Sequence, residues 1–120
     1  MACYGYISGS EYADLKIQET AMLAAGCSRI FCDTGDNKPE RNLLFTQLKL
    51  GDQLIVWRLD KFASSVADLS MLLEAMKKHK ILFQSVQEGL NTETMKHPER
   101  FKRVVKAMAD IEESLSEKSR

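Results

Sequence analysis

Short apolar runs alternate along the chain with longer stretches that mix apolar and polar residues. Four runs are candidates for buried strands, at residues 2–7, 29–32, 53–59 and 81–86. Unbroken apolarity is typical of parallel strands that are covered on both faces. The third run, which is apolar from Leu54 to Trp57, has this character most clearly. The pattern therefore predicts a sheet in which the third strand along the chain is central.

The stretches between the runs carry helix signals. Residues 11–25 are amphipathic and are followed by Gly26, a common helix stop. Pro39 can begin the next helix, because its missing N–H is harmless at the first position. The apolar positions of these two helices are Leu15, Met22, Ala25, Leu43, Leu44 and Leu48.

Two further helices are expected in the second half of the chain. Ser65, with Asp68 three residues later, matches a capping box, and apolar residues follow it at helical spacing. Pro98 opens a final helix whose apolar side extends to Leu115. Strands and helices thus alternate, which predicts a three-layer, doubly wound α/β fold with a mainly parallel sheet of four to five strands and helices on both faces.

Length and charge narrow the range of functions. A chain of 120 residues supports one core, so we expect a single domain over residues 1–120. Its 17 basic and 17 acidic residues cancel, whereas a domain that binds DNA mainly through its own charge is clearly basic. No apolar run approaches the ~20 residues that span a bilayer, and the N-terminus lacks a signal-peptide pattern. We therefore expect a cytoplasmic protein without membrane contact.

The three cysteines, Cys3, Cys27 and Cys32, form no CxxC pair and have no histidine at a metal-ligand spacing. Their neighbours are apolar, which indicates reduced thiols packed in the core of a cytosolic protein. No metal and no cofactor are expected.

Polar residues follow the first and third runs, where an open parallel sheet gathers its functional groups. Ser10 comes after the first run, and Asp60 and Lys61 come after the third. The hydroxyl of Ser10 has two alternative roles, as the cap of the following helix or as a nucleophile. Because His79 and His97 lie in charged stretches, no Ser-His-Asp arrangement is expected. A nucleophilic Ser10 would then need nearby cations and a phosphate substrate.

A series of ordered motifs extends from residue 5 to about residue 115. They lie at residues 5–10, 24–27, 51–60, 91–94 and 107–112, with Gln18 in the first helix. Residues 51–60 fit the pattern Gly-Asp-x-Leu-Val-Val-x-x-Leu-Asp, and Gln18 stands one residue closer to Ser10 than is usual. With these motifs the chain resembles the serine site-specific recombinases, the resolvase and invertase family.

The resemblance implies a catalytic domain in which Ser10 attacks a DNA phosphodiester and forms a 5′-phosphoserine link, without metal or nucleotide. Family members act as tetramers, and their long C-terminal helix pairs subunits as dimers. Here that helix would be cut short at Arg120. The helix-turn-helix that reads DNA in the family is absent from the chain. We therefore expect DNA contact through a domain outside this chain, or only weakly, and a homodimer or tetramer formed through the C-terminal helix.

The phosphate-binding arginines of the family are only partly kept. Arg41 and Asp60 match family positions, whereas Ser8, Lys61 and Ser64 stand where the resemblance places arginines. Lysine keeps the charge without the planar fork that binds two oxygens, and serine keeps neither. One catalytic arginine can be worth ~10³ to 10⁵ in rate. The expected catalytic residues are Ser10, Arg41, Asp60 and Lys61, with cleavage weakened or lost.

Two other functions fit parts of the sequence. A non-catalytic dimerisation or regulatory module derived from a recombinase would explain the missing arginines and the neutral charge. Asp14 and Glu113, which stand where the family has glutamine and arginine, agree with it, because carboxylates repel a DNA backbone. A phosphate-accepting receiver domain is the weaker alternative. It needs paired acidic residues after the first strand to hold a divalent cation, and residues 8–10 have none.

Overall fold

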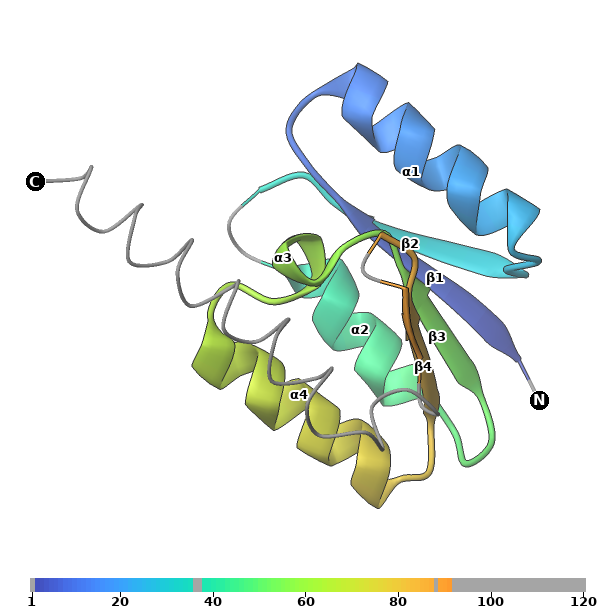
Figure 1. The fold of residues 1–120 in the computed structure, drawn as a ribbon, viewed down its shortest axis with the longest axis vertical. Coiled ribbons are helices and arrows are strands. Elements are labelled where there is room, and N and C mark those ends of the chain that lie inside the picture. The colour runs from blue at the N-terminus through green and yellow to red at the C-terminus, as the bar shows by residue number, and fades with distance from the viewer. Residues whose placement is uncertain (1, 36–37, 88, 92–120) are drawn as a thin grey trace, which may run out of the picture.

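The computed structural model describes residues 2–35, 38–87 and 89–91. These residues form a five-stranded sheet in the order β2-β1-β3-β4-β5, with helices on both faces (Figure 1). The strands are β1 (Cys3–Ser8), β2 (Arg29–Asp33), β3 (Gln53–Val56), β4 (Leu82–Ser85) and β5 (Leu90–Asn91). The helices are α1 (Tyr12–Ala24), α2 (Pro39–Gln47), α3 (Leu59–Phe62) and α4 (Val66–Lys78). The predicted doubly wound α/β fold is confirmed.

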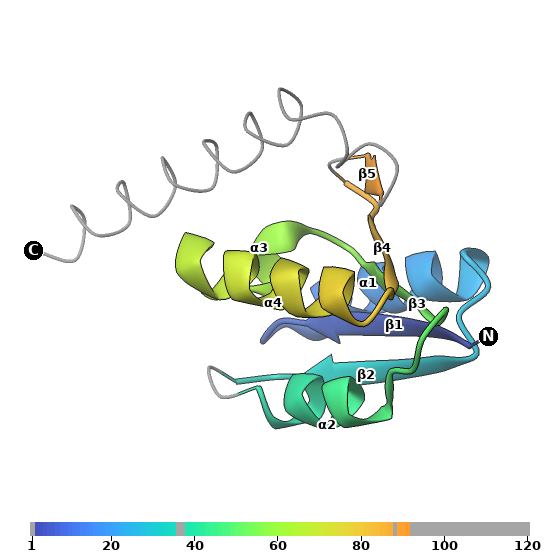
Figure 2. The same ribbon diagram turned by 90° about the horizontal axis from the view of Figure 1, so that it is seen from below.

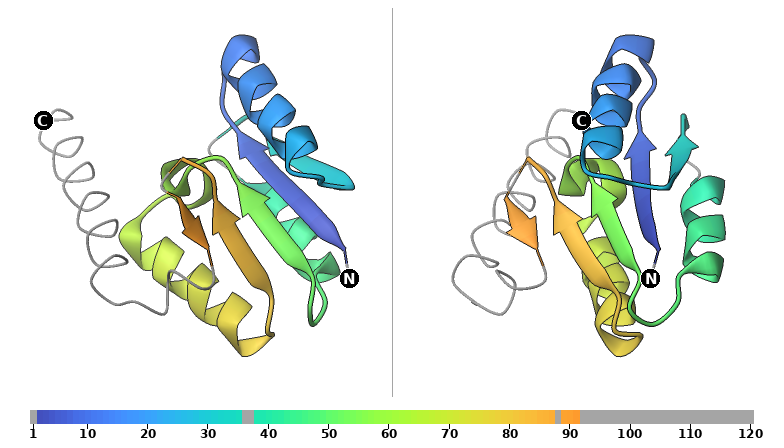
Figure 3. Two further views of the ribbon diagram at one scale, coloured as in Figure 1. Left: turned by 45° about the vertical axis from the view of Figure 1, so that its right-hand side comes forward. Right: turned by 90° about the vertical axis from the view of Figure 1, so that its right-hand side faces the viewer.

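The winding of the sheet reverses at β1. The chain passes from β1 outward to β2, then returns to the other side of β1 to form β3 and β4 (Figure 3). β1 pairs in parallel with β2 and β3, and β3 pairs in parallel with β4, whereas β5 is antiparallel at the edge. The loops that follow β1 and β3 therefore leave the same end of the sheet as neighbours. Such a switch point is where open α/β sheets bind their ligands.

Helices cover the two faces of the sheet unequally. Leu54 and Val56 of β3 belong to a large apolar cluster with α2, α3 and α4, whereas Ile55 between them belongs to a smaller cluster with α1. In the edge-on view of Figure 2, α2 lies beside β2. The large cluster includes Phe62 of α3, whose ring contacts those of Tyr6, Phe45 and Phe83. α3 is therefore anchored in the larger part of the core.

The central position of the third strand is confirmed, but its predicted end is wrong. β3 stops at Val56, and Leu59 begins the one-turn helix α3. The side chain of Leu59 is fully buried in the large cluster, so its apolar character reflects core packing rather than a longer strand. Leu43 of α2, expected in the core, is 44% exposed, because Leu44 is the residue that points inward.

The cysteines do not all lie in the core as predicted. Cys32 is exposed on β2, the edge strand, while Phe31 and Asp33 on either side of it are buried. Cys27 is buried, and its Sγ lies 3.7 Å from Sγ of the half-buried Cys3. Burial and the contact with Cys3 raise the pKa of the Cys27 thiol to about 12. This thiol therefore stays protonated and unreactive at neutral pH.

α4 begins as the capping-box pattern predicts. The N–H of Asp68 donates to Oγ of Ser65 over 3.0 Å. The Asp68 carboxylate does not complete a reciprocal box with Ser65, however, because it accepts from the N–H and hydroxyl of Ser64 and from Arg41. The final helix predicted over residues 98–115 lies outside the described residues.

Candidate active site

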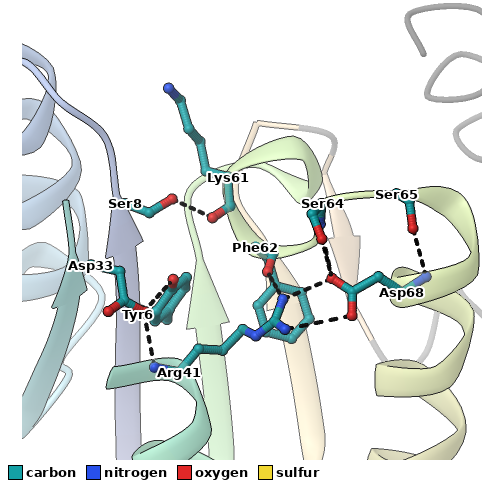
Figure 4. A network of polar contacts seen from close by, with 9 residues as sticks. All are labelled: Tyr6, Ser8, Asp33, Arg41, Lys61, Phe62, Ser64, Ser65 and Asp68. Atoms are coloured by element: carbon teal, nitrogen blue, oxygen red, sulfur yellow. Dashed lines mark hydrogen bonds and ion pairs between the residues drawn. The ribbon is translucent and has the colours of Figure 1, made fainter. Parts of the chain in front are cut away.

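The ends of β1 and β3 are connected through α3. Ser8, the last residue of β1, is buried, and its hydroxyl donates to the carbonyl of Lys61 in α3 (Figure 4). Gln18 of α1 holds the same strand end from the other direction. Its Oε1 accepts from the N–H of Ser8 over 3.1 Å, and its Nε2 donates to the Ser8 carbonyl over 2.8 Å. The fully buried Gln18 thus joins α1 to the end of β1, which is in turn joined to α3.

Ser10 lies two residues beyond Ser8, in the loop between β1 and α1. A capping role for its hydroxyl is wrong, because the residue at the start of α1 is Glu11, which has an extended backbone and makes no side-chain cap. Ser10 is exposed, and within residues 2–35, 38–87 and 89–91 its hydroxyl has no hydrogen-bond partner. An unengaged hydroxyl at the switch point of the sheet is accessible to a substrate.

Lys61 contacts residues on both sides of the loop that carries Ser10. Its carbonyl accepts from Ser8, which precedes Ser10, and its Nζ lies 3.4 Å from Oδ2 of Asp14, which follows in the first turn of α1. The same Asp14 oxygen accepts from Nε2 of Gln18 over 3.1 Å. The structure therefore brings Lys61 to the loop that carries Ser10, with a carboxylate beside its ammonium group.

Arg41, also expected in the catalytic set, is engaged elsewhere. Figure 4 shows its side chain extending from α2 to the start of α4, whereas the Lys61 side chain points to the other side of α3. Nη1 of Arg41 donates to the carbonyl of Phe62 and to Oδ2 of Asp68, both over 2.8 Å. The ion-paired side chains of Arg41 and Asp68 are only 12% and 14% exposed. The guanidinium thus holds α2, α3 and α4 together.

The Asp68 carboxylate is held in its charged form. Burial alone would raise its pKa, but hydrogen bonds from the Ser64 N–H, from Arg41 and from the Ser64 hydroxyl outweigh burial and lower the pKa below its ordinary value. Asp60, the fourth expected site residue, lies on the surface, and its Oδ1 is 3.1 Å from Nε of Arg58. That pair is more than two-fifths exposed on both side chains.

Asp33, at the end of β2, is a buried polar residue that the sequence analysis did not single out. Its two carboxylate oxygens accept from the N–H groups of Glu40 and Arg41, each over 3.0 Å, and so cap the first turn of α2. Oδ2 also accepts from the hydroxyl of Tyr6 over 2.8 Å (Figure 4). Burial and this carboxylate raise the pKa of Tyr6 above its ordinary value. An acidic residue a few positions before Pro39, which begins the helix, was the available signal.

Two negative observations apply to the described part of the chain. It contains no group of three His, Cys, Asp or Glu side chains placed to hold a metal ion. None of its helices is long and apolar enough to cross a bilayer.

The sequence profile of the family described as "Resolvase, N terminal domain" matches residues 2–120. The chain belongs to this family of serine recombinases. Relatives include the DNA-invertase of Escherichia phage P1, which is 32% identical over 116 residues, 92% of this chain and 62% of that protein. The DNA-invertase hin of Salmonella typhimurium is 31% identical over 120 residues, 96% of this chain and 63% of that protein. The chain thus spans about three-fifths of the length of these relatives.

The resolvase fold is also found in a solved structure. The crystal structure of a resolvase family site-specific recombinase from Streptococcus pneumoniae superposes with a TM-score of 0.71 at 20% identity. The match covers 99% of this chain and 92% of that one. At this identity the likeness concerns the fold, and it agrees with the α/β architecture described above.

Proposed function

We propose that the chain is the catalytic domain of a DNA invertase or resolvase, with Ser10 as its nucleophile. In the reaction the Ser10 oxygen bonds to a DNA phosphorus, the bond to the 3′-oxygen breaks, and a 5′-phosphoserine and a free 3′-hydroxyl result. The hydroxyl of Ser10 loses a proton and the leaving oxygen gains one. The observation that carries this proposal is the exposed hydroxyl of Ser10 at the switch point, which has no partner among the described residues, with Lys61 bound to Ser8 before it and to Asp14 after it.

The same site supports weak cleavage at most. Phosphoryl transfer depends on cations placed around the phosphate, and Ser8, Lys61 and Ser64 occupy positions that the family fills with arginine. The hydroxyls of Ser8 and Ser64 are bonded to protein groups, the Lys61 carbonyl and the Asp68 carboxylate. Arg41, proposed as a catalytic residue, has to leave Asp68 before its guanidinium reaches a phosphate. Asp60 is proposed as the acidic residue of the set.

The proposal extends to the partners of this domain. DNA is the substrate, in the cytoplasm, and a helix-turn-helix outside these 120 residues supplies most of the affinity, because the neutral charge of this chain provides little. Subunits assemble as dimers or tetramers through the C-terminal helix. No metal or nucleotide takes part.

The decisive experiment is a search for the covalent intermediate. The protein is incubated with supercoiled DNA that carries candidate recombination sites, quenched with detergent, and digested for mass spectrometry. We expect a small yield of adduct with phosphate on the peptide that contains Ser10, and none with Ser10→Ala. Absence of any Ser10-dependent adduct from the wild-type protein would contradict the nucleophile.

The engaged cations favour a second candidate function, a non-catalytic dimerisation or regulatory module. Arg41 is bound to Asp68, and Lys61 to Asp14, so neither is ready to bind a phosphate. A module of this kind self-associates without cutting DNA. Sedimentation at micromolar concentration tests it: a dimer without any adduct supports the module, and a strict monomer contradicts it.

A further inference from the structure

Asp14 places a carboxylate at the cation of the candidate active site. Its Oδ2 lies 3.4 Å from Nζ of Lys61, and the two side chains remain 37% and 28% exposed. The pair is therefore reachable from solvent. A carboxylate in this position gives the ammonium the same kind of partner, an anionic oxygen, that a phosphate would give it.

Gln18 of α1 holds this carboxylate in place, and Gly9 leaves room for it. Nε2 of the buried Gln18 donates to Oδ2 of Asp14 over 3.1 Å, and Gln18 is itself held by the backbone of Ser8. Gly9 provides the space, since a Cβ at this position would lie 2.9 Å from the same Oδ2. The contact between Asp14 and Lys61 is thus built into the end of β1 and is not a chance meeting of two flexible side chains.

We propose that Asp14 is an internal counter-ion, which a DNA phosphate has to displace from Lys61 before it can bind beside Ser10. Asp14 is in this sense the residue that sets the affinity of Lys61 for phosphate. The inference rests on the proposed function only in taking DNA phosphate as the ligand. Partly exposed ion pairs are weak, so the competition corresponds to about three- to five-fold in binding.

The first test removes the charge of the competitor. Binding of a fluorescein-labelled DNA duplex of arbitrary sequence is measured by anisotropy from about 50 to 200 mM salt, a range in which phosphate contacts are readily detected. We expect Asp14→Asn to bind about three- to five-fold more tightly than wild type. The slope of the logarithmic salt dependence should stay nearly the same, because Lys61 makes the same phosphate contact in both complexes. Glu19→Gln, on the same helix, makes the same change in net charge and is the matched control.

The second test moves the carboxylate and keeps the charge. The φ of Gly9 is not positive, so alanine fits its backbone, but the added Cβ pushes the Asp14 carboxylate away from its place. Gly9→Ala should therefore tighten DNA binding in the same direction as Asp14→Asn. Both gains should disappear when Lys61→Gln is present, because the ammonium that they release is then missing.

Three results would overturn the inference. The first is a gain in DNA affinity for Asp14→Asn that is no larger than the gain for Glu19→Gln. The second is a gain in DNA affinity that persists when Lys61→Gln is also present. The third is a lack of measurable DNA binding by every variant at low salt. Thermal denaturation shows whether Asp14→Asn or Gly9→Ala has unfolded. If one of them has, DNA binding by the other one tests the inference. No step of this test requires cleavage. Binding as expected without a Ser10 adduct would therefore contradict the proposed nucleophile and leave the role of Asp14 standing.

Discussion

An ion pair between a basic side chain and an aspartate lies on each side of α3, but the two pairs have different surroundings. On one side, Arg41 and Asp68 are almost buried and make several hydrogen bonds that join three helices. On the other, Lys61 and Asp14 make a single, longer and more exposed ion pair beside the loop of Ser10. Both pairs bring a cation to the end of the sheet where a substrate would bind.

The difference separates a structural cation from one whose partner can be exchanged. A buried, hydrogen-bonded pair is costly to break, because the partner left behind is an uncompensated charge. An exposed pair is easily exchanged for another ion. Membership in the resolvase family therefore does not by itself give a residue its role, since the surroundings of Arg41 and Lys61 assign them different tasks.

The largest expected effect is that of Arg41→Ala. Loss of this guanidinium leaves the largely buried Asp68 without its cation and the Phe62 carbonyl without its donor, which should lower the free energy of unfolding by about 2 to 4 kcal/mol. Urea denaturation measures it. Arg58→Ala removes an arginine from an exposed pair and is the control, with an expected loss under about 1 kcal/mol. Equal losses would abolish the distinction between the two sides.

The contribution of the Arg41–Asp68 pair to stability should also depend on pH. The pKa of Asp68 is lower in the folded protein than in the unfolded chain, so its contribution is complete above the ordinary aspartate pKa and is lost as pH falls through the folded value. Asp68→Asn should therefore cost about 1 to 3 kcal/mol at pH 7. The difference in the free energy of unfolding between Asp68→Asn and wild type should shrink as the pH falls from roughly 5 to 2. A difference that stays constant over this interval would contradict the ionised role of Asp68.

A smaller effect is expected for the hydrogen bond beneath this network. Tyr6→Phe removes the donor to Asp33 but leaves that carboxylate bonded to the first turn of α2, so we expect a loss of about 1 kcal/mol. Tyr4→Phe, on the same strand and the same face, is the matched control and should be nearly neutral. Thermal denaturation of the two variants side by side provides the measurement.

The smallest change in stability is expected for Lys61→Gln. Its pair with Asp14 is partly exposed, so the free energy of unfolding should change by less than about 0.5 kcal/mol. The backbone carbonyl that accepts from Ser8 is unaffected by the substitution. A loss as large as that of Arg41→Ala, measured in the same urea series, would mean that Lys61 too is a structural cation.

Local signals in the sequence predicted much of the fold. The apolar run of β3, Pro39 at the start of α2 and Ser65 at the start of α4 each act within a few residues, and each is confirmed. The break between β3 and α3 was missed because Leu59 is as apolar as a strand residue. Apolar periodicity over so short a run does not distinguish a strand from a buried helical turn.

The site was only partly predictable for a different reason. The rule that ligands bind at the carboxyl ends of strands located Ser10 and Lys61 correctly at the switch point. The partners of the charges, however, come from distant segments: Arg41 and Asp68 are 27 positions apart. Only the assembled fold shows which carboxylate each cation meets. The cap of α1 remained an alternative role for Ser10 in the sequence, because a serine before a helix has the same local pattern whether or not it caps.

The unequal covering of the sheet has a consequence for motion. α1 contributes only Met22 to the fully buried part of the smaller cluster, whereas α3 and α4 share the larger one. Segments with less buried apolar contact unfold locally at lower free energy, so backbone amides of α1 should exchange with deuterium before those of α4. Each local unfolding of α1 would move Asp14 away from Lys61, while the ion pair between Arg41 and Asp68 stays intact. Local unfolding of α1 would thus control how long the ammonium group of Lys61 is without its carboxylate partner.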